Sequence, residues 1–196
     1  MGTNRPYILT ALHCADIDKN GILSDAEKTA AENWSFKFNY KKICNTNSIV
    51  SYVYETYPGA YFRASWLPTD FLLLEIKESI KNPNIRFLGW DITGYYPYQP
   101  IGIHHPAGEP MKISFDYDMA YPNDVTFNSG GLTFPLYSHF DVWFNDGGIE
   151  GGSSGSPLFW AWDGDPEYRI IGQAHCINET VCPPKQRTRY GRFSRS

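Results

Sequence analysis

Three polar side chains from distant parts of the chain have the types that nucleophilic acyl transfer requires. His13 lies in LTALHC (9–14), Asp70 precedes the apolar run FLLLEI, and Ser154 lies in EGGSSGSPL (150–158). A serine hydroxyl is a weak nucleophile until an imidazole takes its proton, and a carboxylate must hold that imidazole in the right tautomer. The chain order His, Asp, Ser is one known arrangement of such a catalytic set. The three residues are therefore candidates for general base, orienting carboxylate and nucleophile.

Each of these segments also has an ordinary structural interpretation. A lone histidine at a strand end is usually structural, an aspartate before a strand is usually a turn residue, and a Gly/Ser run is usually a loop. The order of the three segments, in a chain with β character, favours the catalytic interpretation. If it is right, activity should rise as His13 loses its proton near neutral pH.

The glycines around Ser154 suit a loop whose backbone must approach a reacting atom. The oxygen of an attacked carbonyl gains negative charge and needs two aimed N–H donors. Gly152, which has no Cβ, can turn its own N–H into the site, and the N–H of Ser154 is expected to be the second donor of this oxyanion hole. Gly155 would leave room behind the nucleophile, and Pro157 would end the loop.

The elements that must position these residues are mostly β-strands. Seventeen glycines and 14 prolines separate short runs that are rich in aromatic and β-branched residues. One helix is expected over 24–34, where SDAEKTAAENW begins with a capping box made by Ser24 and Glu27. Short strands at this spacing predict an all-β sandwich or barrel. The expected strands are 34–40, 48–57, 70–76, 85–92, 112–118, 140–144, 156–162 and 168–176.

Composition and charge exclude several classes of protein. A chain with 42% hydrophobic and 16% aromatic residues is not disordered. A net charge of −4 does not suggest a nucleic-acid partner. No run of about 20 apolar residues predicts a membrane span, and the opening MGTNRPYILT has no long apolar segment of a signal peptide.

The segment DIDKNGILSDAE (16–27) fits the twelve-residue calcium loop of EF-hands. Gly21 supplies the sharp turn, and the helix over 24–34 follows. The loop leaves directly from His13 and Cys14 with no entering helix, so the alternative is a polar insertion before a capped helix. Calcium would be structural here and would steady the segment behind His13. The expected ligands are Asp16, Asp18, Asn20, the Ile22 carbonyl, Ser24 and Glu27.

Six ordered motifs resemble those of chymotrypsin-like serine endopeptidases, most closely the bacterial lysyl endopeptidases. They are LTALHC (9–14), DFLLLEI (70–76), GIHHPAGEPMKIS (102–114), EGGSSGSPL (150–158), GQAHC (172–176) and YGR (190–192). The resemblance spans nearly the whole chain. It implies two antiparallel six-stranded barrels, with His13 and Asp70 on the first (1–95) and Ser154 on the second (96–196). It also implies hydrolysis of protein or peptide substrates without a catalytic cofactor, by a secreted or periplasmic monomer.

The sequence departs from that family at both ends and in its cysteines. The family places two strands before the one that carries His13, and a helix after YGRFSRS. Cys14, Cys44 and Cys182 match family cysteines that bond to partners upstream, which this sequence lacks. Cys176 and Cys182 are a substitute pair, and free thiols are the alternative. These departures keep a second function open, that of a truncated, non-catalytic homologue or binding module.

The residues expected around the substrate also differ from the family. Thr188 stands where lysyl endopeptidases carry the aspartate that binds lysine, and Cys176 and Ile177 follow His175 where they carry glycines. This pattern predicts a shallower pocket that prefers small or uncharged P1 residues. Glu150 offers charge at the pocket rim, which keeps a preference for lysine open.

The remaining histidines gave no metal prediction. His104, His105, His139 and His175 lack local ligand spacing such as H-E-x-x-H, so zinc is not expected. His175 is instead expected to line the substrate cleft. Ser153 stands where trypsins carry an aspartate, so activation by pairing of a new N-terminus with that position is not expected.

Overall fold

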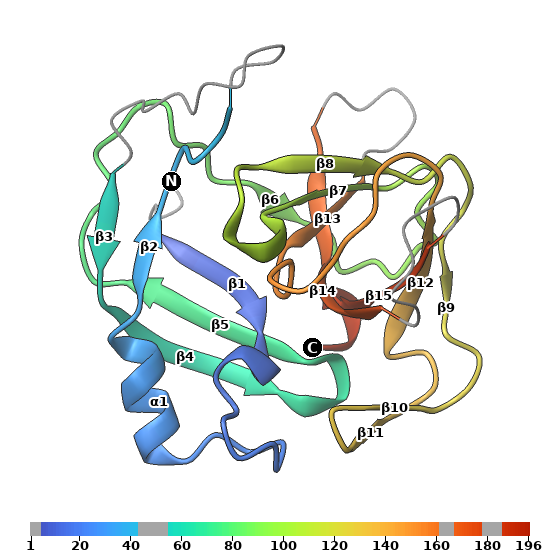
Figure 1. Ribbon diagram of the computed structural model, residues 1–196, viewed down its shortest axis with the longest axis horizontal. Helices are drawn as coiled ribbons and strands as arrows, with labels where there is room; N and C mark the ends of the chain where they lie inside the picture. Colours follow the sequence, from blue (N-terminus) through green and yellow to red (C-terminus); the bar gives the residue numbers. More distant parts are fainter. Residues whose placement is uncertain (1–4, 43–54, 161–166, 178–185) are drawn as a thin grey trace.

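The computed structural model describes residues 5–42, 55–160, 167–177 and 186–196. These residues form a large curled sheet, a three-stranded sheet, two two-stranded sheets and one short α-helix (Figure 1). The elements of the first half are β1 (Tyr7–Ala11), α1 (Asp25–Glu32), β2 (Ser35–Lys37), β3 (Thr56–Pro58), β4 (Ala60–Trp66), β5 (Phe71–Ile76) and β6 (Gly89–Trp90). Those of the second half are β7 (Ile101–His104), β8 (Lys112–Phe115), β9 (Tyr121–Pro122), β10 (Phe127–Ser129), β11 (Leu132–Phe134), β12 (His139–Phe144), β13 (Pro157–Trp160), β14 (Arg169–Ile177) and β15 (Gln186–Arg192).

The smaller sheet is antiparallel, with β5 between β1 and β4. Leu72, Leu74 and Ile76 on β5 are almost fully buried, and Leu23 and Ala31 from the α1 region join the same core. Burial of each such leucine contributes about 1.5–3 kcal/mol. The central strand β5, which begins directly after Asp70, is therefore held by this core and by its pairing with β1 and β4.

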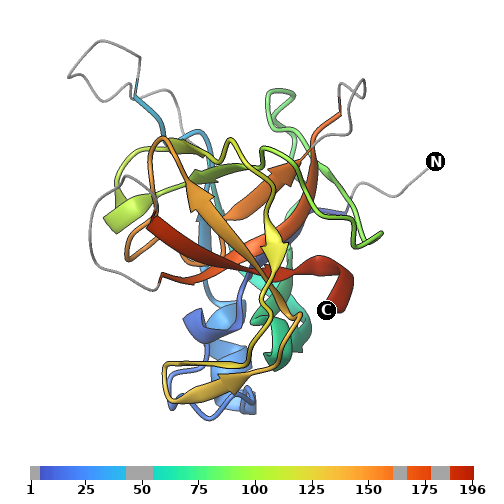
Figure 2. The ribbon, with the colours of Figure 1, turned by 90° about the vertical axis from the view of Figure 1, so that its right-hand side faces the viewer.

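The larger sheet runs in the order β8-β7-β13-β14-β15-β12-β9, and β6 pairs with β14 in parallel. Figure 2 shows this sheet curling around its own core. The core contains Val142, Phe144, Leu158, Ala174 and Tyr190, all completely buried. It supports the loop before β13, which carries Ser154.

The two sheets are in direct contact near the ends of β1 and β5. Gln173 Nε2 donates to the carbonyl oxygen of Thr69 across 2.7 Å. A Cβ atom at Gly191 would lie 1.9 Å from that same oxygen, so β15 approaches Thr69 as closely as only a glycine allows. These contacts fix the sheet that carries Asp70 relative to the sheet that leads to Ser154.

The predicted mostly-β class with one short helix is confirmed. The helix expected over 24–34 is α1, and its capping box is present: Ser24 Oγ accepts from Glu27 N, and the Glu27 side chain accepts from Ser24 N. The predicted two closed six-stranded barrels are not shown. In the described residues the large sheet is a curled half-barrel, and the smaller sheet has three strands. Within the described residues β2 and β3 pair with each other and do not extend the three-stranded sheet.

Several predicted strands are shorter in the structure, and one is largely wrong. Only Gly89 and Trp90 of the 85–92 segment pair, because no other described strand lies beside the rest of it. Its large side chains Phe87, Leu88 and Ile92 are exposed. Most of the expected strand 48–57 lies outside the described residues, as do Cys44 and Cys182. No helix in the described part of the chain is long and apolar enough to cross a membrane.

Candidate active site

The structure brings His13, Asp70 and Ser154 together. Asp70 Oδ2 lies 2.6 Å from His13 Nδ1, and Asp70 Oδ1 accepts the backbone N–H of His13 across 2.8 Å. On the other side of the ring, His13 Nε2 lies 2.8 Å from Ser154 Oγ. A carboxylate, an imidazole and a hydroxyl thus form a continuous hydrogen-bonded chain across the contact between the two sheets.

Local backbone geometry places His13 and Asp70 side by side. His13 follows β1 in the 3₁₀ turn Leu12–Cys14, and Asp70 follows the 3₁₀ turn Leu67–Thr69 with a left-handed φ of 57°. Ala11, directly before the first turn, pairs with Phe71, directly after Asp70, and Leu12 N donates to Asp70 O across 2.8 Å. The end of the smaller sheet therefore places the Asp70 carboxylate against the His13 ring, whose Nε2 lies beside Ser154 Oγ.

The electrostatics of His13 are set by Asp70. Burial alone would lower the pKa of His13, but the hydrogen bond and charge of Asp70, with a smaller effect of Cys14, raise that pKa to about 10. Asp70 is completely buried and accepts two hydrogen bonds from His13. A buried carboxylate in this position stabilises the imidazolium form of the ring.

The loop that carries Ser154 depends on two glycines, one on each side of that residue. Gly152 has φ 90° and Gly155 has φ 79°, a region that L side chains rarely adopt. A Cβ atom at Gly152 would lie 2.7 Å from Ala107 N, and one at Gly155 would lie 2.2 Å from Thr10 Oγ1. Among the described residues, none accepts a hydrogen bond from the backbone N–H of Gly152 or Ser154. Within this part of the chain both N–H groups are therefore without an acceptor.

A buried chain of hydrogen bonds holds this loop from behind. Ser114 Oγ donates to Gly148 O (3.3 Å), so it accepts from His104 Nε2 (3.1 Å). His104 Nδ1 then accepts from Ser153 Oγ (2.9 Å), which in turn accepts from Glu150 N (3.4 Å). Burial lowers the pKa of His104 to about 4, so the ring is neutral at pH 7 and can serve as donor and acceptor at once.

A second buried chain ends beside Asp70. Ser138 Oγ donates to Pro135 O (2.6 Å), so it accepts from His139 Nδ1 (2.7 Å). His139 Nε2 then accepts from His175 Nδ1 (2.9 Å), and His175 Nε2 lies 3.9 Å from Asp70 Oδ2. Burial lowers the pKa of both histidines to about 3; for His175 the charge of Asp70 acts in the opposite direction but does not prevail.

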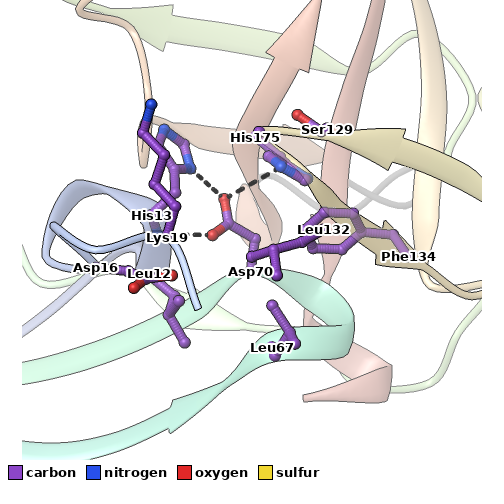
Figure 3. A pocket seen from close by; sticks show the side chains of 11 residues that line it. Leu12, His13, Asp16, Lys19, Leu67, Asp70, Ser129, Leu132, Phe134 and His175 are labelled. Atoms are coloured by element: carbon purple, nitrogen blue, oxygen red, sulfur yellow. Dashed lines mark hydrogen bonds and ion pairs between the residues drawn. The ribbon is translucent and has the colours of Figure 1, made fainter. Parts of the chain in front are cut away.

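His175 lines a cavity of about 220 Å³ next to His13 and Asp70 (Figure 3). The hairpin of β10 and β11 closes one side of it, where Phe134 packs edge-on against the His175 ring at 4.3 Å between centroids. The cavity therefore forms where the hairpin of the second half meets the residues that carry Asp70.

The other residues predicted to contact substrate lie on neighbouring strands or at the loop. Ile177 faces Thr188 across β14 and β15, and Cys176 is half-buried one residue before. Thr188 is completely buried, and its Oγ1 has no hydrogen-bond partner among the described residues. Glu150 is exposed, and its charge helps to raise the pKa of Lys112, after the effects of Glu109.

The cysteines described by the structure form no disulfide. Cys14 is exposed and Cys176 is half-buried, and both are free thiols. The predicted alternative of a Cys176–Cys182 pair involves a residue outside the described ranges.

The predicted calcium loop contains a compact acidic cluster. Ligand atoms of Asp16, Asp18 and Glu27 lie within 4.8 Å of one another, so these residues could hold a metal ion. Gly21 N donates to Asp16 Oδ2 across 2.8 Å, and Gly21 has φ 82°. The other predicted ligands are in the same turn: Asn20 Oδ1 accepts from Ile22 N (2.7 Å), and Ser24 Oγ donates to Glu27 Oε2 (2.7 Å).

Sequence reasoning missed the two buried serine–histidine chains. The sequence names His104 and His139 only as histidines without metal-ligand spacing, and no motif in it contains Ser138. Their partners lie far away in the sequence, 49 residues for His104 and Ser153 and 36 for His139 and His175. A histidine next to a serine within a mostly apolar strand, as in SHFDVWF (138–144), was the only local signal.

Two solved structures share the overall fold of this chain. The chain resembles the crystal structure of the MamO protease domain from Magnetospirillum magneticum (TM-score 0.54, 12% identity, 98% of this chain and 87% of that chain). It also resembles the Rv3671c protease from M. tuberculosis (TM-score 0.50, 10% identity, 72% of this chain and 59% of that chain). At these identities the likeness concerns the fold, that of trypsin-like protease domains. No curated protein matches the chain.

The family comparison covers almost the whole sequence. The model of the lysyl endopeptidase C-terminal domain matches residues 2–190, which include all of the predicted motifs except the end of YGR. The expected relation to lysyl endopeptidases is confirmed at this level: the chain belongs to the lysyl endopeptidase C-terminal domain family.

Proposed function

We propose that the protein is a serine endopeptidase in which Ser154 is the nucleophile, His13 the general base and acid, and Asp70 the orienting carboxylate. The observation that carries the proposal is the hydrogen-bonded chain through His13, with 2.6 Å to Asp70 and 2.8 Å to Ser154. Donor and acceptor distances in this range suit proton transfer from the hydroxyl to the ring. Membership of the lysyl endopeptidase family and the protease-domain fold support the same reaction class.

The proposed reaction proceeds through an acyl-enzyme. Ser154 Oγ attacks the peptide carbonyl while its proton passes to His13 Nε2, and Asp70 stabilises the resulting imidazolium. The negative oxygen of the tetrahedral intermediate accepts hydrogen bonds from the N–H groups of Gly152 and Ser154. His13 then gives its proton to the leaving amine, which breaks the peptide bond. Water repeats the sequence, giving one proton to His13 and releasing the acid product and free Ser154.

For the P1 residue we propose a preference for small or uncharged side chains. Thr188 is buried and carries no charge, and Ile177 stands across from it on the neighbouring strand. Glu150 lies exposed at the loop, where its charge is screened by water. A scan of peptide substrates tests this part: cleavage restricted to lysine would contradict it.

Calcium is the proposed ion of the 16–27 loop. Its donor set is made of carboxylate, amide, hydroxyl and carbonyl oxygens, the ligands that Ca²⁺ prefers over transition metals. Asp16 and Glu27 are buried, and burial of two carboxylates is unfavourable unless donors or a cation compensate them. Because the loop begins three residues after His13, a bound ion would stabilise the turn that orients the imidazole.

A fluorophosphonate probe followed by peptide mass mapping tests the enzymatic proposal. Wild-type protein should be labelled on Ser154, and Ser154→Ala should abolish labelling and lower kcat by about 10⁶. Ser156→Ala is the matched control, because the same loop carries it and it has no role in the proposed chemistry. A folded wild-type chain that hydrolyses no peptide and never reacts with the probe would instead support a non-catalytic homologue.

A further inference from the structure

The cavity beside Asp70 gathers two imidazoles and a carboxylate that no local sequence motif brings together. Ligand atoms of His13, Asp70 and His175 lie within 4.8 Å of one another. Figure 3 shows the Asp70 carboxylate between the two rings, with His175 on the far side from the turn that carries His13. Two histidines and one carboxylate are a common zinc ligand set.

The hydrogen bonds behind His175 determine which of its nitrogens carries the proton. A hydroxyl has one proton, and that of Ser138 goes to Pro135 O at 2.6 Å. His139 must therefore donate from Nδ1 to Ser138 and accept at Nε2, which assigns the proton of His175 to Nδ1. The Nε2 atom of His175 is left with a free lone pair.

This lone pair faces the Asp70 carboxylate without forming a hydrogen bond to it (Figure 3). The side chain of His175 is only 3% exposed, and Asp70 Oδ2 lies 3.9 Å from Nε2, beyond hydrogen-bond distance. Within the described residues Nε2 makes no hydrogen bond. A metal-binding histidine typically donates its other ring N–H to a protein acceptor, and His139 Nε2 already serves as that acceptor for His175.

We propose that Zn²⁺ binds between His13 Nδ1, Asp70 Oδ2 and His175 Nε2, with water as the fourth ligand. Ligand atoms around tetrahedral zinc lie about 3.4 Å apart, given metal–ligand bonds of about 2.1 Å. The His13–Asp70 distance of 2.6 Å must widen and the His175–Asp70 distance of 3.9 Å must shorten, each by less than 1 Å. Rotation of the His13 ring, which is the more exposed of the two, provides this change.

Zinc at this site would act as a reversible inhibitor, a conclusion that rests on the proposed endopeptidase function. In the active tautomer His13 carries its proton on Nδ1 and accepts the Ser154 proton at Nε2. Below its pKa of about 10 the His13 ring carries a proton on each nitrogen, so zinc binding at Nδ1 releases the Nδ1 proton to water and leaves the other proton on Nε2. His13 then has no lone pair for Ser154, and general-base catalysis stops.

Direct binding tests the site without reference to activity. Isothermal titration of Ser154→Ala with zinc chloride, in excess calcium so that the 16–27 loop is saturated, should show one site. Cobalt(II) in the same protein should give the intense visible absorption of a four-coordinate ion. Octahedral cobalt spectra, or no heat with zinc, would overturn the proposal.

Two substitutions and a matched control locate the site. His175→Phe keeps the ring packing against Phe134 and should abolish zinc binding, and His139→Phe should weaken it by about 10–100-fold through loss of the orienting acceptor. His105→Phe is the control, because His105 is an exposed histidine that stacks on Tyr40 away from the cavity. Equal zinc affinity in His175→Phe and His105→Phe would refute the site. If His175→Phe does not fold, the His139→Phe titration and the cobalt spectrum decide.

Inhibition is measured separately. Zinc should inhibit peptide hydrolysis by the wild-type protein, and a chelator added in slight excess over zinc should restore it. Zinc binding to a chain that never reacts with the serine probe would reject the proposed function and keep the site. Labelling of Ser154 in a chain that binds no zinc would reject the site and keep the function.

Discussion

Ser153 and His104 share a buried hydrogen bond of 2.9 Å directly behind the loop that carries Ser154. It is one link of the chain from Glu150 N to Gly148 O, so it ties the loop to β7 and β8. The oxyanion donors proposed for Gly152 and Ser154 flank Ser153. Their direction should therefore depend on this bond.

Ser153→Ala should lower the free energy of unfolding by about 1–3 kcal/mol, because it leaves the buried Nδ1 of His104 without a donor. It should also reduce kcat more than it changes KM. Urea denaturation and steady-state kinetics measure the two effects. The double variant Ser153→Ala/His104→Phe removes both partners, so its loss of stability should be smaller than the sum of the single losses. If the two single losses of stability add up in the double variant, Ser153 and His104 do not stabilise the protein through this hydrogen bond.

Gly155→Ala should be destabilising by at least about 2 kcal/mol. The substitution forces a side chain onto a φ of 79° and places Cβ 2.2 Å from Thr10 Oγ1. Gly151→Ala is the matched control, because a Cβ atom there meets nothing within 4 Å. Thermal melts of the two variants should separate them clearly, and equal melting temperatures would contradict the close approach of β1 to the loop.

The pH dependence of kcat/KM should follow the deprotonation of His13. Asp70 raises the pKa of His13 to about 10 against the effect of burial, so below that pH most of the protein holds His13 as imidazolium, which cannot accept the Ser154 proton. Activity should increase with pH through neutrality and continue to increase above pH 8. With a histidine of ordinary pKa, activity would already have reached its plateau at that pH. Asp70→Asn removes the raising charge, so it should move this limb to lower pH while reducing kcat by about 10⁴. A flat profile between pH 5 and 8 would exclude His13 as the base.

Calcium should raise the melting temperature of the wild-type protein, because it binds the folded loop and not the unfolded chain. Glu27→Gln removes one of the two carboxylate oxygens expected at the last ligand position and should eliminate most of the shift. Asp25→Asn is the matched control, since the Asp25 side chain is fully exposed in the same first helical turn. If calorimetry detects neither heat of binding nor a raised melting temperature, calcium does not bind this loop.

Thr188→Asp should change the P1 preference toward lysine. It introduces a carboxylate at a completely buried position, where a lysine ammonium would compensate it. The ratio of kcat/KM for lysine over alanine substrates should increase at least about tenfold, and Thr188→Asn, without the charge, should leave the ratio nearly unchanged. An unchanged ratio in Thr188→Asp would show that Thr188 does not line the P1 pocket.

The parts of the site that short motifs encode could be predicted from the sequence. The capping box at Ser24 and Glu27 and the position of Asp70 directly before a strand are confirmed as structural features. Each depends on neighbours within a few residues. The sharp turns at Gly21 and Gly152 follow from the same kind of local constraint, because only glycine reaches their backbone angles without strain.

The histidine pair could not be predicted in this way. His139 pairs with Gly191 on β15, and Gln173 on β14 pairs with the same Gly191, so the register of three strands brings His139 near His175. Nothing within either segment encodes that register. The failed strand over 85–92 has a related cause: its apolar pattern indicates strand propensity, but pairing requires a neighbouring strand, and β14 offers one only to Gly89 and Trp90.

The approach of Gly191 to Thr69 O, together with the hydrogen bond from Gln173 Nε2, joins the two sheets directly, so we expect them to unfold together. A calorimetric scan should accordingly show one heat-absorption peak, with the heat expected for a single cooperative unit. If the proposed function is right, we expect substrate to bind with little relative movement of the two sheets, and proteolysis of the folded protein by its own copies to be slow.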